Sequence, residues 1–275
     1  MAPSDHGEWP LGRDSGGGGP PLHCPAVPGA PTFDDALDAV AGVEGWMTDA
    51  QARRLWDRAA VLRPPALVVE IGSYRGRSAI VLGKAAPDGV EVVAIDPHAG
   101  NDRGPQQITG PAEEGERDHE AFLANLKAAG VGERVRHVRL PSSDATSEVA
   151  GEIDLLYIDG AHRYRPALDD VRRWGDRVRR GGTLLVHDSF SSIGVTLALL
   201  TALFIGRRFR YVGRAGSMAE YRREDLGPRD RVANALRQAV EVPWFLRNVL
   251  IKILMVAKLT PLTRLLGHRG GNWPY

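Results

Sequence analysis

Residues 68–78 read VVEIGSYRGRS, a short apolar run that leads directly into a turn with Gly72 and Gly76. The acid Glu70 comes just before the first glycine. Glycine-rich turns after a strand commonly cradle a phosphate, and a fixed carboxylate at Glu70 would repel a diphosphate. The same carboxylate suits a ligand that carries cationic sulfonium and ammonium groups. The stretch therefore predicts a strand, a turn and a helix that favour S-adenosylmethionine over NAD.

Four more apolar runs of this kind follow along the chain, each bounded by turn residues and separated by helix-like stretches. The five runs cover residues 66–72, 90–97, 134–140, 153–160 and 181–189. Continuous apolar strands that alternate with helices indicate a parallel sheet covered on both faces. Residues 208–223 then alternate around a glycine-bearing turn, as in an antiparallel hairpin. We therefore expect an α/β fold with a doubly wound, mostly parallel seven-stranded sheet, Rossmann-like, that closes with an antiparallel C-terminal hairpin.

Length and composition limit the classes of protein that remain. A chain of 275 residues that is 43% hydrophobic can bury one large core, and its formal net charge of +1 gives no field that would recruit nucleic acid. Cys24 is the only cysteine, which excludes an intrachain disulfide and a cysteine-cluster zinc site. The first residues lack a basic segment followed by an apolar one, so we expect no secretory signal and a cytoplasmic location.

Three regions are expected. Residues 1–32 are rich in Gly, Pro and Ser and are predicted to be a disordered tail. Residues 33–225 form the main domain, and residues 226–275 a helical extension. From position 242 to 275 there is no acidic residue. Arg247, Asn248, Lys252 and Lys258 lie on one arc of a helical wheel, into which Met255 and Leu259 intrude, so an imperfect basic amphipathic helix is predicted there. This leaves open peripheral contact with the inner face of a membrane, packing on the domain, or a homo-oligomer contact.

Polar residues at the strand ends are the candidate cofactor site, because ligands of open parallel sheets bind outside the carboxyl ends of the strands. Asp96 ends the second strand and can accept hydrogen bonds from ribose hydroxyls, while Ser143 and Asp144 can meet an adenine ring. For Glu70 an alternative stays open, in which it only caps the following helix. The full set of expected cofactor-binding residues is Glu70, Gly72, Ser73, Tyr74, Gly76, Ser78, Asp96, Ser143, Asp144 and Asp159.

Asp159 and Asp188 end two further strands and are expected to converge over the cleft, flanked by His162 and His187. Such oxygen ligands suit Mg²⁺, with Asp159, Asp188 and His187 as its candidate ligands. The alternative is that both acids only cap turns and helices. Asp159, His162 and His187 are the catalytic candidates, and His162 is the first choice for a general base, with His187 as the alternative; His162 could also simply pack in its loop.

The blocks VVEIGSYRGRS, VVAIDPH, IDLLYIDGAHRYRPALDDVRRW and GGTLLVHDSF together resemble the class I S-adenosylmethionine-dependent methyltransferases. The similar branch methylates sugars and other natural-product hydroxyls and includes cephalosporin hydroxylase-like proteins. The resemblance covers residues 45–222. It implies that Glu70 and Gly72 line the methionine part of the cofactor, that Asp96 binds its ribose, and that Asp159 faces the reacting methyl. Metal-dependent relatives have a third ligand, Asp or Asn, beside the second Asp, where this sequence has His187 and Ser189.

The expected activity is therefore methyl transfer from S-adenosylmethionine to a hydroxyl of a small-molecule, sugar or glycolipid acceptor. Two alternatives remain open at this point. One is a hydroxylase or another reaction on the same scaffold. The other is a non-catalytic protein that binds S-adenosylmethionine or associates with a membrane.

Overall fold

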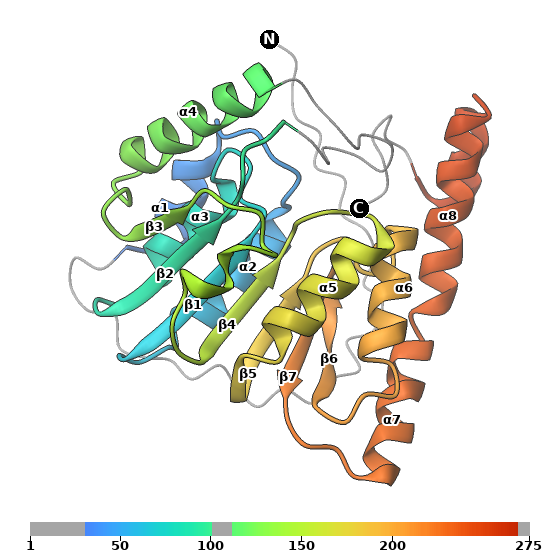
Figure 1. Ribbon diagram of the computed structural model, residues 1–275. Helices are drawn as coiled ribbons and strands as arrows, with labels where there is room; N and C mark the ends of the chain where they lie inside the picture. The colour runs from blue at the N-terminus through green and yellow to red at the C-terminus, as the bar shows by residue number, and fades with distance from the viewer. Residues whose placement is uncertain (1–30, 101–111, 269–275) are drawn as a thin grey trace. The chain divides into compact units, whose positions relative to one another are not determined.

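The computed structural model describes residues 31–100 and 112–268. Seven strands form one sheet in the order β3-β2-β1-β4-β5-β7-β6, which confirms the predicted fold class (Figure 1). The strands are β1 Ala66–Ile71, β2 Val90–Ile95, β3 Val135–Val138, β4 Ile153–Ile158, β5 Val178–Val186, β6 Phe209–Ala215 and β7 Met218–Arg223. The first five strands pair in parallel, whereas β7 runs antiparallel to both β5 and β6.

Helices cover both faces of the sheet, as the unbroken apolar strands require. The α-helices are α1 Phe33–Val40, α2 Asp49–Ala59, α3 Arg77–Ala85, α4 Ala112–Ala128, α5 Tyr164–Gly175, α6 Ile193–Ala202, α7 Pro228–Ala239 and α8 Val242–Val256. Two 3-10 helices, η1 Ala145–Ser147 and η2 Thr260–Leu266, complete the elements.

Alternate residues of each central strand enter different cores. In β1, Val68 packs in a cluster with Leu55 of α2 and Ile80 of α3, whereas Val69 packs in a second cluster with Trp174 of α5. All of these side chains are fully buried. Burial of one such side chain contributes roughly 1.5–3 kcal/mol, so both faces of the sheet are strongly stabilised. This two-sided burial explains why β1 and β4 show no polar alternation.

The N-terminal helices are fixed by capping boxes. Thr48 is the N-cap of α2, where its hydroxyl accepts from the backbone N–H of Gln51 and the Gln51 side chain accepts from the Thr48 backbone. Such a cap contributes about 1 kcal/mol. The same Gln51 amide donates to the Ser217 hydroxyl in the turn between β6 and β7. The predicted tail lies outside the described residues except for Pro31 and Thr32.

The C-terminal extension differs from the expected single basic helix. It consists of α7, α8 and η2. Asn248 and Lys252 of the expected basic arc face the domain rather than solvent, while Arg247 is half-buried against η2. Asn248 is fully buried, and Arg247 and Lys252 donate to backbone carbonyls of Leu266 and Ser191. Within residues 31–100 and 112–268 no helix combines the length and the apolar character that crossing a bilayer needs.

Candidate functional site

A cavity of about 550 Å³ opens at the carboxyl ends of β1, β2 and β4. It lies where the strand order reverses between β1 and β4, the usual ligand position in open α/β sheets. Its size suits a nucleoside-containing ligand. Eight of the predicted site residues line it, namely Gly72, Ser73, Tyr74, Ser78, Asp96, Ser143, Asp159 and His162.

The glycine turn is shaped by close backbone contacts. Gly72 has a φ of +85°, and its N–H donates to the Ile95 carbonyl. A Cβ added at Gly72 would lie 2.2 Å from the Asp159 carbonyl oxygen, so no side chain fits where β1 meets β4. Gly76, with a φ of +88°, is the N-cap of α3. The turn thus brings backbone N–H groups to the cavity wall.

Asp96 holds this turn in place. Its carboxylate accepts from the backbone N–H groups of Ser73 at 2.9 Å, Tyr74 at 2.8 Å and His98 at 2.8 Å. An ionised carboxylate offers about four acceptor positions, so one remains for a ligand hydroxyl. Asp96 lines the cavity with a side chain that is 16% exposed. The predicted ribose ligand is therefore also the group that orders the loop.

Glu70 lies behind the turn rather than at its mouth. Its side chain is fully buried, and neither carboxylate oxygen has a partner in hydrogen-bond geometry within the described residues. Burial raises the pKa of Glu70 to about 8, against the opposite influence of the Ser73 and Ser78 hydroxyls. The premise of an exposed anion that attracts a cation across the surface is thus wrong. Glu70 is a buried acid beneath the cavity floor, and a direct contact with cofactor stays a prediction.

The remaining cofactor candidates are only partly brought together. Ser143 lines the cavity, while Asp144 accepts from the Ser143 hydroxyl at 3.0 Å and lies outside the described lining, as does Gly76. The sequence analysis missed Trp46, whose ring stacks on Tyr74 with centroids 5.4 Å apart at the cavity. It also missed Asp170, which lines the same cavity. Burial raises the pKa of Asp170 to about 6, and its carboxylate accepts from the Ser142 hydroxyl. The adjacent acids Asp169 and Asp170 were the sequence feature that could have identified this site residue.

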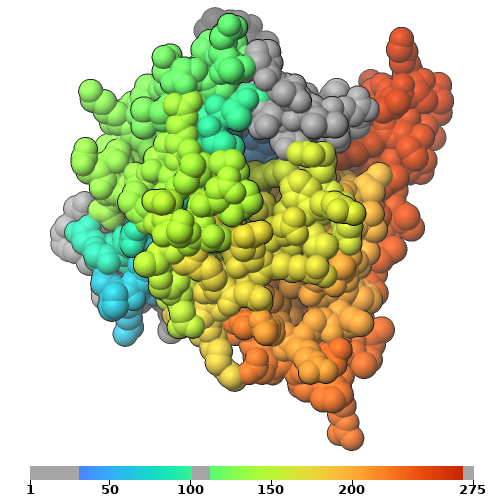
Figure 2. All heavy atoms as spheres, viewed as in Figure 1, coloured from blue at the N-terminus to red at the C-terminus, as the bar shows by residue number. Residues whose placement is uncertain are grey.

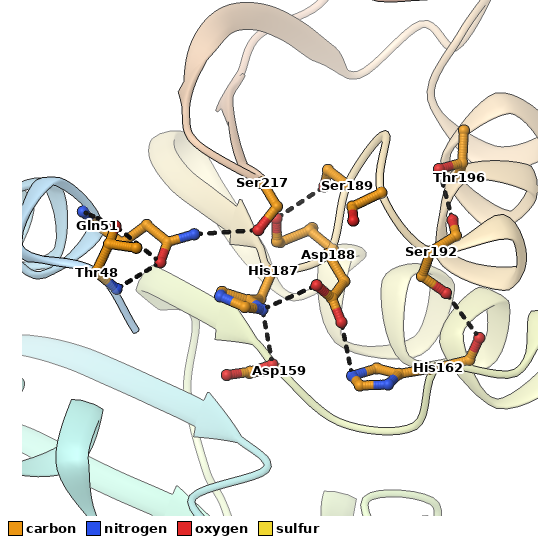
Figure 3. Close-up of polar contacts among 12 residues, drawn as sticks. Thr48, Gln51, Asp159, His162, His187, Asp188, Ser189, Ser192, Thr196 and Ser217 are labelled. Atoms are coloured by element: carbon orange, nitrogen blue, oxygen red, sulfur yellow. Dashed lines mark hydrogen bonds and ion pairs between the residues drawn. The ribbon is translucent and has the colours of Figure 1, made fainter. Parts of the chain in front are cut away.

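The four catalytic and metal candidates form one alternating chain of acids and histidines (Figure 3). His162 Nε2 lies 2.9 Å from Asp188 Oδ2. His187 Nδ1 lies 3.5 Å from Asp188 Oδ1 and 3.2 Å from Asp159 Oδ1. The Tyr157 hydroxyl donates to the other Asp159 oxygen at 3.0 Å. The four side chains predicted to converge are therefore in contact, but only Asp159 and His162 line the cavity, and His187 and Asp188 are buried outside its lining.

The alternation of acids and histidines sets the protonation of these side chains. Burial alone would lower the pKa of His187, but Asp159 and Asp188 outweigh it and raise that pKa to about 9. Burial likewise disfavours the cationic form of His162, and its hydrogen bond to Asp188 raises the pKa above the ordinary value. The pKa of Asp188 falls to about 2: burial opposes its charge, while His162, His187 and Lys252 stabilise the anion. These shifts favour a cationic His187 beside an anionic Asp188.

This arrangement does not fit the expected Mg²⁺ site. Each of the two acids already faces a histidine. In the part of the chain that the structure describes, no group of three or more acid, histidine or cysteine side chains has a geometry that could hold a metal ion. The incomplete triad noted in the sequence is consistent with this result.

The C-terminal helix α8 supports the turn that carries Asp188. Asp188 and Phe190 both have a φ of +56°, a conformation that side chains other than glycine adopt at a cost. The Asn248 amide donates to the Phe190 carbonyl at 3.4 Å, and Lys252 Nζ donates to the Ser191 carbonyl at 2.9 Å. The extension therefore helps to hold the residue that orients His162.

Comparison with known proteins agrees with the fold. Residues 69–189 match a family model described as a methyltransferase domain. Cofactor-bound Rv0187 from MTB is 22% identical, aligned over 70% of this chain and 90% of that chain with a TM-score of 0.50. The O-methyltransferase NovP is 16% identical over 70% of this chain and 88% of that chain, with a TM-score of 0.52. The SAH-bound Podospora anserina methyltransferase PaMTH1 is 16% identical over 72% and 89%, with a TM-score of 0.50.

The fold is that of the class I S-adenosylmethionine-dependent methyltransferases, with the antiparallel β7 beside β5. Residues 69–189, which match the methyltransferase-domain model, carry the glycine turn, Asp96 and the four side chains from Asp159 to Asp188. The resemblance predicted from the sequence is thereby confirmed.

Proposed function

We propose that this chain transfers a methyl group from S-adenosylmethionine to a hydroxyl of a small-molecule acceptor. The observation that carries the proposal is the shared cavity: the loop ordered by Asp96 lines one side, and His162, bonded to Asp188, lines the other. A cofactor site and a candidate base thus face one volume. Similarity to the O-methyltransferase NovP favours oxygen as the acceptor atom.

The cavity residues fit the cofactor chemically. The free acceptor position of Asp96 suits a ribose hydroxyl, Ser143 suits a heterocycle edge, and Tyr74 with Trp46 supplies an aromatic wall. When bound, S-adenosylmethionine supplies an electrophilic methyl on a sulfonium.

His162 is the proposed general base. When Nε2–H donates to Asp188, the neutral ring carries its lone pair on Nδ1, and that atom accepts the acceptor's hydroxyl proton. Asp188 fixes the tautomer and stabilises the imidazolium that forms. Asp159 and His187 remain ion-paired with each other during this step. Because general base catalysis contributes typically about 10²–10⁴-fold, this dyad accounts for a large part of the expected rate.

A sugar or glycolipid remains the proposed acceptor class. At the end of the cavity that holds the candidate base, Asp159, His162 and Arg163 line the wall and can exchange hydrogen bonds with several hydroxyls at once. The predicted cytoplasmic location is compatible with such an acceptor and stays a prediction.

The test is transfer of labelled methyl from S-adenosylmethionine to a panel of sugars, glycolipids and phenols, with EDTA present. We expect label in an ether-linked product of one acceptor, with EDTA without effect. Oxygen consumption without label would instead support the hydroxylase alternative, and cofactor binding without label on any acceptor would support the non-catalytic one.

A further inference from the structure

The helices α7 and α8 have their polarity reversed relative to an ordinary surface helix. Their fully buried positions include three amides, Asn234, Gln238 and Asn248. Their outward positions include eight large apolar residues, 40–74% exposed, and α7 also exposes Arg229, Asp230 and Arg237. We call the eight apolar residues, with three that follow in the η2 segment, the apolar face: Val232, Leu236, Val240, Val242, Leu246, Leu250, Ile253, Val256, Leu259, Leu262 and Leu265.

The buried amides fix this orientation. Asn234 accepts from the Tyr211 N–H at 2.7 Å and donates to the Phe209 carbonyl at 3.1 Å, and so satisfies backbone groups of the edge strand β6. Gln238 accepts from the Tyr221 hydroxyl at 3.2 Å. A rotation of α7 to bury its exposed apolar side chains would leave these backbone and hydroxyl groups unpaired, at about 1–3 kcal/mol each. The apolar face is therefore held outward by the fold.

The charge around this face identifies its occupant. From position 242 to the C-terminus the sequence contains no acid. In Val242–His268 the exposed charged residues are Lys258 and Arg264, both cationic, and on α7 they are Arg229, Asp230 and Arg237, so cations outnumber acids along the face. Apolar side chains bordered by cations match the surface of an anionic bilayer, where each cation near the surface gains about 1 kcal/mol. A second copy related by a two-fold axis would place this cationic border against itself.

We propose that the apolar face of α7, α8 and η2 docks on an anionic membrane surface. The helices lie on the bilayer without crossing it, with leucine, isoleucine and valine side chains in the acyl boundary and Lys258 and Arg264 among the headgroups. Figure 2 shows α8 as a ridge at the margin of the molecule, in red, where a flat surface can reach it. The proposal goes beyond methyl transfer and does not depend on it.

The experiment is cosedimentation of the full chain with phosphatidylglycerol–phosphatidylcholine vesicles and with pure phosphatidylcholine vesicles. We expect binding to the anionic vesicles that falls at least about tenfold when salt rises from roughly 0.1 to 1 M, because the Debye length shortens to about 3 Å. The double variant Leu246→Gln/Ile253→Gln removes two exposed apolar side chains and should lose binding by about tenfold or more.

The matched control is Val61→Gln/Leu123→Gln, which removes two apolar side chains of similar exposure, 58% and 48% against 58% and 57%, outside the apolar face. It should bind as the wild type does. A second variant, Lys258→Glu/Arg264→Glu, should lose preference for anionic over neutral vesicles. Absence of binding to anionic vesicles, or equal binding by the two glutamine variants, would overturn the proposal. So would a dimer in sedimentation equilibrium that Leu246→Gln/Ile253→Gln dissociates while vesicle binding is absent. Cofactor titration of each variant reports separately on the methyltransferase site.

Discussion

The two walls of the cavity are held by different physical means. On the β1–β2 side, backbone geometry dominates: two glycines with positive φ and three N–H groups gathered by Asp96. On the β4–β5 side, side-chain charge dominates: two acids and two histidines alternate within 3.5 Å of each other. The first wall is suited to hold a ligand in a fixed shape. The second is suited to accept and hold a proton.

The largest expected effect is at Gly72, where the two walls touch. Gly72→Ala places a Cβ 2.2 Å from the Asp159 carbonyl oxygen at a φ of +85°. The backbone must shift, so we expect a stability loss of about 3 kcal/mol and loss of cofactor binding. Urea denaturation and calorimetric titration measure the two effects.

Gly151→Ala is the matched control, because Gly151 has a φ of +86° and open space around the added carbon. It should cost about 1 kcal/mol, the conformational part alone, with full cofactor binding. Equal losses in the two variants would show that the contact between the walls is unimportant.

The next effect separates proton transfer from binding. His162→Gln should lower kcat by about 100-fold or more and leave the Kd for S-adenosylmethionine within about twofold. Because Asp188 raises the pKa of His162 and a base must be neutral, wild-type kcat/KM should rise with pH to a plateau above the ordinary histidine pKa.

Asp188→Asn removes the group that raises the His162 pKa, so the rising limb of the profile should move to lower pH while kcat falls. If the rising limb of the pH profile does not move in Asp188→Asn, a group other than His162 is responsible for it. A weakened Kd in His162→Gln would mean that this wall binds cofactor rather than moves a proton.

The smallest effect concerns the buried acid beneath the first wall. The pKa of Glu70 is about 8 in the folded chain and near 4.5 when unfolded, so the folded state holds a proton that the unfolded state releases. Stability should therefore fall as pH rises from about 4.5 to 8. The Glu70→Gln variant lacks this slope. The difference in free energy of unfolding between variant and wild type should therefore shift in favour of the variant by on the order of 2 kcal/mol from pH 5 to pH 8.

Urea denaturation at the two pH values measures this gain. The variant is compared with wild type at each pH, because Asp170 and His187 also have raised pKa values and add slopes of the same sign. Glu91→Gln, at an exposed site, is the control. Parallel stability curves for Glu70→Gln and wild type would show that Glu70 is ionised in the folded chain.

The difference between the two cavity walls also explains which features could be predicted from the sequence. The strands, the glycine turn and Asp96 were predictable, because buried runs and turn residues act within a few positions of each other. The orientation of Glu70 was not, because a strand residue beside a turn can point above or below the sheet. The Asp188–His162 contact and the inward face of α8 depend on packing between distant segments. Arg247 and Lys252 were expected on a solvated arc, and the fold turns them onto carbonyl groups instead.

The most direct test of the account is calorimetric titration of the full chain with S-adenosylmethionine and, separately, with NAD, repeated with Asp96→Ala. We predict that S-adenosylmethionine binds with a micromolar-range Kd. NAD should not bind, and Asp96→Ala should lose S-adenosylmethionine binding because the loop and the ribose share that carboxylate. Binding of NAD without binding of S-adenosylmethionine would contradict the account.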